Sequence, residues 1–283
     1  MGYEIGIGLT GVAVLAAAAV LFMIGISYRY RLDRQSIHVG RLPASFDGTR
    51  ILFLSDVHRR AIPDAIMKRC QDTGGVDLVL IGGDLREKGV PLERSRDNVR
   101  KLRAIAPVYM VYGNHDYDED IRAFDVMLRD EGVRVLVNES VVLEQGDGSL
   151  IRLIGVDDPR TGRDRLKMAV QDMEGEAEAD FTILLAHDPI IVDKLQPSDR
   201  IDLVFSGHTH GGQISLPIVG AVLRSPYCRG WYTVDHHATT GSALASRLFV
   251  SCGFGTSRMP LRLGAPAEYH LFTLRRPAAA QGQ

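Results

Sequence analysis

Two histidines lie one residue apart between glycines in the segment Gly207-His208-Thr209-His210-Gly211-Gly212. Alternate side chains of an extended backbone point to the same side, and flanking glycines permit turns that other residues resist. Imidazole is the most common side-chain ligand of metals in proteins. The spacing therefore predicts a metal-binding loop and is poorly explained by core packing.

Four other polar clusters each follow a short apolar run. They are Ser55 to His58, Gly82 to Asp84, Gly113 to Asp116 and Ala186 to Asp188. The apolar runs before these clusters and before the histidine loop predict buried strands at Ile51 to Leu54, Leu78 to Ile81, Val108 to Tyr112, Phe181 to Leu185 and Leu203 to Phe205. Open α/β sheets commonly bind ligands at strand ends, so we expect the clusters to form one site.

The clusters combine nitrogen and oxygen ligands. They hold five of the nine histidines of the chain, together with Asp56, Asp84, Asn114 and Asp116. Such a set favours manganese, iron, cobalt or zinc over calcium. The three cysteines are an odd number without metal or redox spacing, which argues against a structural zinc, an iron–sulfur cluster or a disulfide framework. For a single histidine a hydrogen-bonded strand end is the alternative, but the whole set predicts two divalent metals.

The order Asp-x-His, Gly-Asp, Gly-Asn-His-Asp, His and Gly-His-x-His resembles the calcineurin-like metallophosphoesterases, whose five blocks are all present in the family's order. The resemblance covers about residues 50–274. It implies an α/β fold, a four-layer α/β/β/α sandwich of two packed sheets flanked by helices. Segments 155–159, 211–213 and 253–257 resemble the bacterial branch of membrane-associated phosphohydrolases.

The resemblance also implies a role for each ligand. Asp56, His58 and His210 would bind one metal, Asn114, His187 and His208 the second, and Asp84 would bridge the two. We expect Mn²⁺, with iron or zinc as alternatives, because the preferences of these metals overlap. Two such ions activate a shared water and absorb charge during in-line displacement at phosphorus.

His115 receives no metal from the resemblance and is predicted to act on the substrate as a proton donor or charge stabiliser. Asp116 is expected to orient its ring, and the alternative is that Asp116 caps a helix that begins near Tyr117. Arg59 and Arg86 follow metal-ligand positions and are expected to contact substrate phosphate, since a guanidinium can hold two phosphate oxygens. The alternative for both arginines is a solvated surface position.

The segment Ile5 to Tyr28 contains no charged residue. As a helix it would extend ~36 Å, enough to cross a hydrocarbon core of roughly 30 Å, so it predicts a transmembrane anchor at residues 5–28. Glu4 precedes it and no Lys or Arg does, which argues against a signal peptide. Arg29, Arg31 and Arg34 follow, so the positive-inside tendency places the catalytic domain on the cytoplasmic side of the inner membrane.

The remaining chain is divided into a juxtamembrane segment and entry strand at 29–49, one catalytic domain at 50–275 and a flexible tail at 276–283. Its length suits a single core. Nothing in the sequence sets the oligomeric state. The net charge of −2 does not provide the basic field of a protein that grips nucleic acid, so a nucleic-acid partner is disfavoured.

These expectations together predict a membrane-anchored, dinuclear metal-dependent phosphoesterase. Its partners would be the lipid bilayer and a phosphodiester or pyrophosphate in a lipid-linked molecule. UDP-2,3-diacylglucosamine, a substrate of lipid A synthesis, is the specific candidate that the resemblance implies. The first alternative is a broad phosphodiesterase or phosphomonoesterase with a soluble or cell-envelope substrate. The second alternative is a metal-bound membrane scaffold without catalytic activity.

Overall fold

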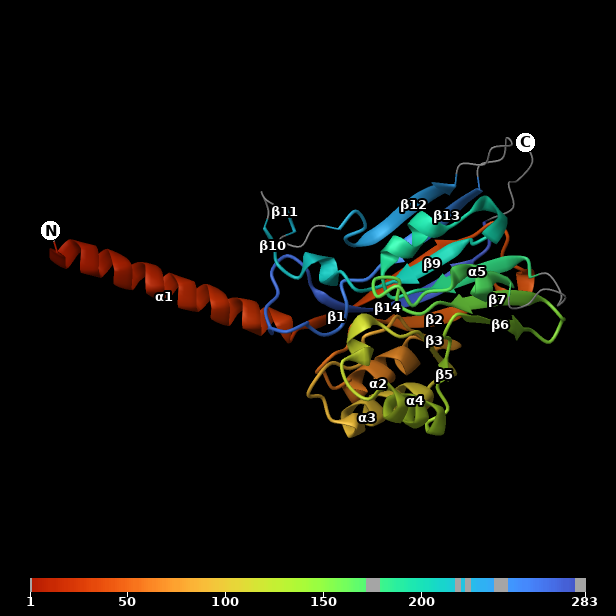
Figure 1. The fold of residues 1–283 in the computed structure, drawn as a ribbon, viewed down its shortest axis with the longest axis horizontal. Coiled ribbons are helices and arrows are strands. Elements are labelled where there is room, and N and C mark those ends of the chain that lie inside the picture. Colours follow the sequence, from red (N-terminus) through yellow and green to blue (C-terminus); the bar gives the residue numbers. More distant parts are fainter. Residues whose placement is uncertain (1, 172–178, 217–219, 222–224, 237–243, 278–283) are drawn as a thin grey trace.

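The computed structural model describes residues 2–171, 179–216, 220–221, 225–236 and 244–277. Helix α1 (Gly2–Ser27) comes first and extends away from the rest of the molecule, as Figure 1 shows. The rest is built on two six-stranded sheets. A short hairpin of β10 (Ser215–Leu216) and β11 (Gly220–Ala221) lies apart from both sheets.

The first sheet has the order β1-β14-β2-β3-β4-β5. Its strands are β1 (Tyr30–His38), β14 (Ala267–Arg275), β2 (Arg50–Leu54), β3 (Leu78–Ile81), β4 (Val108–Met110) and β5 (Arg134–Val135). Strands β2 to β5 run parallel to one another, and β14 is antiparallel to β2. The carboxyl ends of β2, β3 and β4 therefore share one edge of the sheet.

The second sheet has the order β12-β13-β9-β8-β7-β6. Its strands are β6 (Glu139–Glu144), β7 (Leu150–Gly155), β8 (Phe181–Leu185), β9 (Leu203–Ser206), β12 (Gly230–His236) and β13 (Leu244–Val250). Strands β7, β8, β9 and β13 are parallel, while β6 and β12 are antiparallel edges. Strands β8 and β9 thus end side by side.

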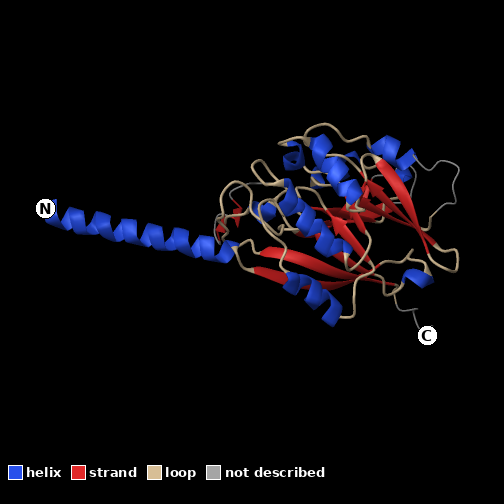
Figure 2. Cartoon of the chain, turned by 90° about the horizontal axis from the view of Figure 1, so that it is seen from below, coloured by secondary structure: helices blue, strands red, loops and turns tan. Residues whose placement is uncertain are grey.

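Helices lie on the outer faces of both sheets (Figure 2). The longer helices α2 (Asp64–Asp72), α3 (Leu92–Arg103) and α4 (Ile121–Asp130) pack on the first sheet, and α5 (Leu166–Gln171) packs on the second. Five 3₁₀ turns complete the described elements: η1 (Ala44–Phe46), η2 (Asn114–Tyr117), η3 (Pro189–Lys194), η4 (Pro197–Asp199) and η5 (His210–Gly212). The order of layers is helices, sheet, sheet, helices.

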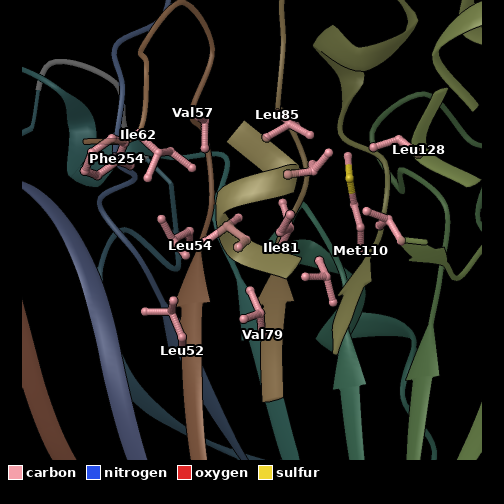
Figure 3. Close-up of a cluster of buried hydrophobic side chains, with 14 of the residues drawn as sticks. Leu52, Leu54, Val57, Ile62, Val79, Ile81, Leu85, Met110, Leu128 and Phe254 are labelled. Carbon is pink, nitrogen blue, oxygen red and sulfur yellow. The ribbon is translucent and has the colours of Figure 1, made fainter. Parts of the chain in front are cut away.

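Three apolar clusters hold these layers together. One lies between the first sheet and its helices, and Figure 3 shows its side chains along the strands and beyond their ends. A second lies between the two sheets, where the Phe53 and Phe205 rings are 5.2 Å apart. The third lies under α5 and η3. Because the central strands are buried on both faces, their sequences are continuous apolar runs without alternation.

The sheet sandwich agrees with the mixed α/β fold expected from the sequence, but the transmembrane helix before it does not. Among the described residues, no helix is both long and apolar enough to cross a membrane. The prediction of a transmembrane anchor at residues 5–28 is therefore wrong, as is the single-pass location in the inner membrane that was derived from it.

The segment expected at 29–49 contains β1, which pairs in parallel with β14 over its whole length, from Tyr30 with Ala267 to His38 with Arg275. This segment is thus part of the first sheet. Of the tail expected at 276–283, residues 278–283 lie outside the described part of the chain.

Candidate metal centre

Seven predicted metal ligands follow the carboxyl ends of five strands. Asp56 and His58 follow β2, Asp84 follows β3, Asn114 follows β4, His187 follows β8, and His208 and His210 follow β9. The first four come from one sheet and the last three from the other. The two sheets are packed face to face, which brings both sets of strand ends to one edge of the sandwich.

Asp56, His58 and His210 form the first group, whose ligand atoms all lie within 4.8 Å of one another. The Nε2 atoms of His58 and His210 are 3.0 Å apart, and Nε2 of His210 is 3.5 Å from Oδ1 of Asp56. All three residues are buried. Two imidazole nitrogens and a carboxylate that converge in this way suit one transition-metal ion.

Asp56, Asp84 and His187 form a second group within the same distance. Oδ2 of Asp84 lies 3.2 Å from Nε2 of His187 and 3.8 Å from Nε2 of His58, so this carboxylate faces both groups. Nδ1 of His208 is 3.1 Å from Nε2 of His187. The donor set therefore extends beyond the first group.

Asn114 supplies an independent test of whether the site fits a metal. Its Oδ1 atom is buried and has no hydrogen-bond partner in the described structure. A buried amide oxygen without a partner is costly, and coordination to a cation at this position would remove that cost. The chemistry and placement of the seven side chains therefore fit divalent metals.

The backbone at the site is strained. Nine described residues other than glycine have a positive φ, and five of them are predicted metal ligands: Asp56 (53°), His58 (50°), Asp84 (52°), His208 (70°) and His210 (51°). This left-handed conformation costs roughly 1 kcal/mol or more for each non-glycine residue and concentrates at functional sites. The fold maintains it here because it turns each ligand toward the common centre.

Two glycines permit the close approach of these loops. Gly83 has a φ of 84°, and a Cβ atom on it would lie 2.6 Å from Nδ1 of His187. A Cβ atom on Gly207 would collide with the Asp56 carboxylate. Both positions therefore exclude a side chain for steric reasons.

Two of the candidate histidines, His58 and His208, are each backed by a buried carboxylate that also pairs with an arginine. Oε2 of Glu87 lies 3.2 Å from Nδ1 of His58, although not aligned as a full hydrogen bond, and Glu87 forms an ion pair with Arg59. Oδ2 of Asp188 lies 3.4 Å from Nε2 of His208 and 2.8 Å from Nε of Arg160. His187 donates instead through Nδ1 to the Gly82 carbonyl, at 2.8 Å.

Carboxylates of this kind fix the ring orientation and raise the basicity of a metal-bound histidine. Sequence reasoning gave no role to Glu87 or Asp188. Asp188 stands directly after His187, and that adjacency was an available signal. For Glu87, the available signal in the sequence was its position three residues after Asp84.

The electrostatics favour the coordinating forms of Asp84 and His210. Burial alone would raise the pKa of Asp84, but the neighbouring His187 and then His58 lower it below the ordinary value. Burial lowers the pKa of His210 well below its usual range, and the positive fields of His58 and Arg262 lower it further. An ionised carboxylate and a neutral imidazole are the forms that bind metals. At His58 and His187 burial lowers the pKa, but neighbouring carboxylates outweigh it and raise the pKa above the ordinary value.

His115 lies beside this centre, but Asp116 is not its partner. Nδ1 of His115 is 2.7 Å from Oδ2 of Asp118, and Nε2 is 3.4 Å from the Ser257 hydroxyl. The buried Asp116 carboxylate accepts the backbone N–H groups of Asp84, Arg86 and Gly113. It therefore braces the β3 and β4 loops, and Asp118 is the carboxylate that contacts the His115 ring.

The two predicted substrate arginines lie in different surroundings. Arg86 is buried, donates to the Asp120 carbonyl and stacks over Phe124 at 4.4 Å, so it faces the core and not the centre. Arg59 is largely exposed and lines a neighbouring cavity.

A cavity of about 480 Å³ opens over the metal residues. It is lined by Asp84, Asn114, His115, Arg160, His208, His210, Gly212, Gln213, Ile214, Ser257, Arg258 and Met259. Sequence reasoning gave no role in the site to Arg160, Gln213 or Ser257, although Gln213 and Ser257 lie in segments that carried the resemblance. Gln213 directly follows the histidine loop, whereas Arg160 and Ser257 lie far from the ligand blocks along the chain and only the fold brings them there.

This chain is similar to known proteins in sequence and in fold. The protein "Uncharacterized protein YpbG" of Bacillus subtilis is 33% identical over 97% of this chain and 99% of its own length. The "Uncharacterized metallophosphoesterase YkuE" of the same organism is 30% identical over 92% and 93%, respectively. Among solved structures, a 5'-nucleotidase precursor from Thermus thermophilus has a TM-score of 0.51 at 16% identity, over 80% of this chain and 54% of that one, and thus shares the fold.

A family model described as "Calcineurin-like phosphoesterase" matches residues 49–212, which is more than half of the chain. The matched range begins before β2 and ends with the last glycine of the histidine loop, so it contains all seven predicted metal ligands. Together with the buried clusters of Asp56, His58, Asp84, His187 and His210, these matches show that the chain belongs to the calcineurin-like phosphoesterase family.

Proposed function

We propose that this chain hydrolyses phosphodiester or pyrophosphate bonds with the help of two divalent metal ions, Mn²⁺ being the first candidate. Membership of the family indicates a phosphoester hydrolase. The observation that carries the proposal is the convergence of buried carboxylates and imidazoles, with Asp84 facing both groups, at the base of an open cavity.

Asp56, His58 and His210 would hold one ion, and Asn114, His187 and His208 the other, with Asp84 between them. Bound ions of this kind activate water and neutralise charge on the phosphoryl group. The protein keeps the ligand atoms in place through the Glu87 and Asp188 carboxylates, so that little reorganisation is needed during the reaction.

His115 is proposed to supply the proton. Its ring lines the cavity, and the Asp118 carboxylate contacts Nδ1 and fixes the orientation of the ring. Nε2 can then donate its proton to the oxygen of the leaving group, which lowers the cost of expelling an alkoxide. Arg160, fixed by Asp188, also lines the cavity and is placed to neutralise phosphate charge.

The finer substrate proposal is a lipid-linked pyrophosphate such as UDP-2,3-diacylglucosamine. The side chains of Ile214 and Met259 in the cavity wall support a substrate that carries an apolar part. A soluble phosphodiester or phosphomonoester is the alternative, and it uses the same metal residues.

A panel of substrates tests both the proposed reaction and the proposed lipid-linked substrate. The purified full chain with Mn²⁺ is assayed against bis(p-nitrophenyl) phosphate, p-nitrophenyl phosphate and UDP-2,3-diacylglucosamine. We expect Mn²⁺-dependent hydrolysis of at least one compound, and its loss in Asp84→Ala. The matched control is Asp64→Ala, which removes an exposed carboxylate paired with Lys101. Cleavage of the lipid compound alone would support the lipid-linked substrate. No turnover of any compound would refute the proposal that the protein is a hydrolase.

His115→Ala distinguishes an enzyme from a metal-bound scaffold. An enzyme should keep its bound metal and lose activity in this variant. A scaffold should show no hydrolysis in either protein and keep its biological effect in the variant.

A further inference from the structure

A second cavity, of about 420 Å³, lies next to the metal cavity and has a different chemistry. Its lining contains four arginines and no aspartate or glutamate. The lining residues are Ser27, Tyr28, Arg59, Arg60, Ala61, Arg94, Gly255, Thr256, Arg258 and Pro260. They come from the end of α1, the loop after β2, the first turn of α3 and the loop between β13 and β14.

The charge of this cavity is not balanced by the protein. Arg59 forms an ion pair with Glu87. Arg94 donates from Nη1 to the Arg59 carbonyl, at 3.0 Å, and so has a backbone partner only. Within the described residues, no carboxylate pairs with Arg60, Arg94 or Arg258. Four guanidiniums with one carboxylate give the cavity an excess of positive charge, which favours an anion.

Arg60 shows that this is more than a set of solvated surface arginines. Its Nη2 donates to the Ser27 carbonyl at the end of α1, and its guanidinium stacks over the Phe254 ring at 4.9 Å. Its Nη1 is buried and has no hydrogen-bond partner in the described structure. Burial lowers the pKa of Arg60 from its ordinary value, and Tyr28 and Tyr30 partly oppose this effect. A partly buried cation without a counterion is unfavourable, and a bound anion would offset that cost.

Arg258 connects the two cavities, because it lines both. The neighbouring Ser257 faces the metal cavity, while Thr256 faces the arginine cavity. A molecule whose reacting phosphate lies at the metal residues can therefore extend past Arg258 into the arginine cavity.

We propose that the arginine cavity is a subsite for a second phosphate group of the substrate. Arg94 and Arg258 hold this group from the exposed side, and Arg60 contributes positive charge from beneath. Planar guanidiniums bind phosphate oxygens in pairs, so several of them around one cavity discriminate in favour of a substrate with two phosphate groups. This inference rests on the proposed function, since it assigns the second group to the substrate of the metal centre.

Chemical modification tests the cavity without any need for turnover. The metal-loaded full chain is treated with phenylglyoxal, with and without inorganic phosphate, and modified arginines are located by mass spectrometry. Phosphate should slow modification of Arg94 and Arg258 several-fold. Arg100 is the internal control, because it lies on the same helix α3 but pairs with Glu131. Equal rates at Arg94 with and without phosphate, or equal protection of Arg100, would overturn the subsite.

A pair of substrates then tests whether the phosphate belongs to the substrate. The p-nitrophenyl ester of thymidine 5′-phosphate is compared with the same ester that carries a 3′-phosphate. The 3′-phosphate should lower KM by about 10-fold in the wild type, as expected for one charge-assisted hydrogen bond. The ratio of the KM without the 3′-phosphate to the KM with it should fall to about 1 in Arg94→Gln and stay at about 10 in Arg100→Gln.

The possible failures are distinguishable. Protection of Arg94 by phosphate together with a KM ratio that Arg94→Gln leaves unchanged would mean that the cavity binds free phosphate, which overturns the assignment to the substrate. If the wild type turned over neither ester, the proposed function would fail, and the modification experiment would still decide whether the cavity binds phosphate.

Discussion

Glu87→Ala should weaken one of the two metal sites and leave the other close to its wild-type affinity. The Glu87 side chain is only 5% exposed, and its Oε2 atom lies 3.2 Å from Nδ1 of His58. Loss of a carboxylate that backs a metal-bound histidine reduces metal affinity by about 10–100-fold. This corresponds to about 1.4–2.8 kcal/mol, and the effect should be confined to the site that contains His58.

The assay is equilibrium dialysis of the full chain against buffered Mn²⁺, with bound metal measured by mass spectrometry. The wild type should bind two Mn²⁺ per chain. In Glu87→Ala, half-occupancy of one of the two sites should require about 10–100-fold more free Mn²⁺ than in the wild type. Asp188→Ala, which removes the carboxylate behind His208, should weaken the other site.

Glu131→Ala is the matched control. Glu131 also pairs with arginines, Arg96 and Arg100, but it lies near no candidate metal ligand. The prediction that Glu87 supports the site of His58 would be wrong if Glu87→Ala bound both ions with wild-type affinity. It would also fail if Glu131→Ala weakened binding to the same degree, because the effect would then come from a general loss of negative charge.

Three further predictions concern stability, each measured by urea unfolding. Phe53→Ala, which empties a fully buried position between the sheets, should lower the free energy of unfolding by about 3–5 kcal/mol. Asp120→Ala should lower it by about 1 kcal/mol, because the Asp120 carboxylate accepts two backbone N–H groups at the start of α4. The hydrogen bond from His270 lowers the pKa of Asp33. The ionised Asp33 carboxylate therefore stabilises the folded protein above the unfolded pKa, and this contribution is lost as the pH falls through the lower folded pKa. Asp33→Asn should therefore destabilise the protein by about 1 kcal/mol at pH 7 and by progressively less in acid; an equal loss at all pH values would contradict this.

Much of the fold could be predicted from the sequence because the central strands are buried on both faces. The run Leu78 to Ile81 coincides with β3, and Phe181 to Leu185 coincides with β8. Since parallel strands end at a common edge, the polar residues after them could be expected to meet. Oδ2 of the candidate ligand Asp84 does lie 3.2 Å from Nε2 of the candidate ligand His187.

The contacts around His115 could not be predicted in this way. Its partner is three residues along the chain and not one, because η2 is a 3₁₀ turn, in which side chains at i and i+3 lie on the same side. Asp116 points inward from the same turn. Arg86 also turns into the core, where it stacks on Phe124, a residue of a different element.

The transmembrane prediction failed for a different reason. It relied on the absence of charge between Ile5 and Tyr28, on the apolar composition of this segment and on the length that it would have as a helix. A span needs length and apolar character together in one helix, and no helix in the part of the chain that the structure describes has both. The sequence pattern at the strand ends was specific because several independent blocks had to agree, whereas the anchor rested on one.

The central claim is that two metal ions lie between the strand ends of the two sheets. The most direct measurement is a crystal structure of the full chain with Mn²⁺, with anomalous scattering collected at the manganese edge. We expect two anomalous peaks about 3.5–4 Å apart, with Asp84 between them, one peak beside His58 and His210 and the other beside His187 and Asn114. A single peak, or peaks away from Asp84, would contradict it.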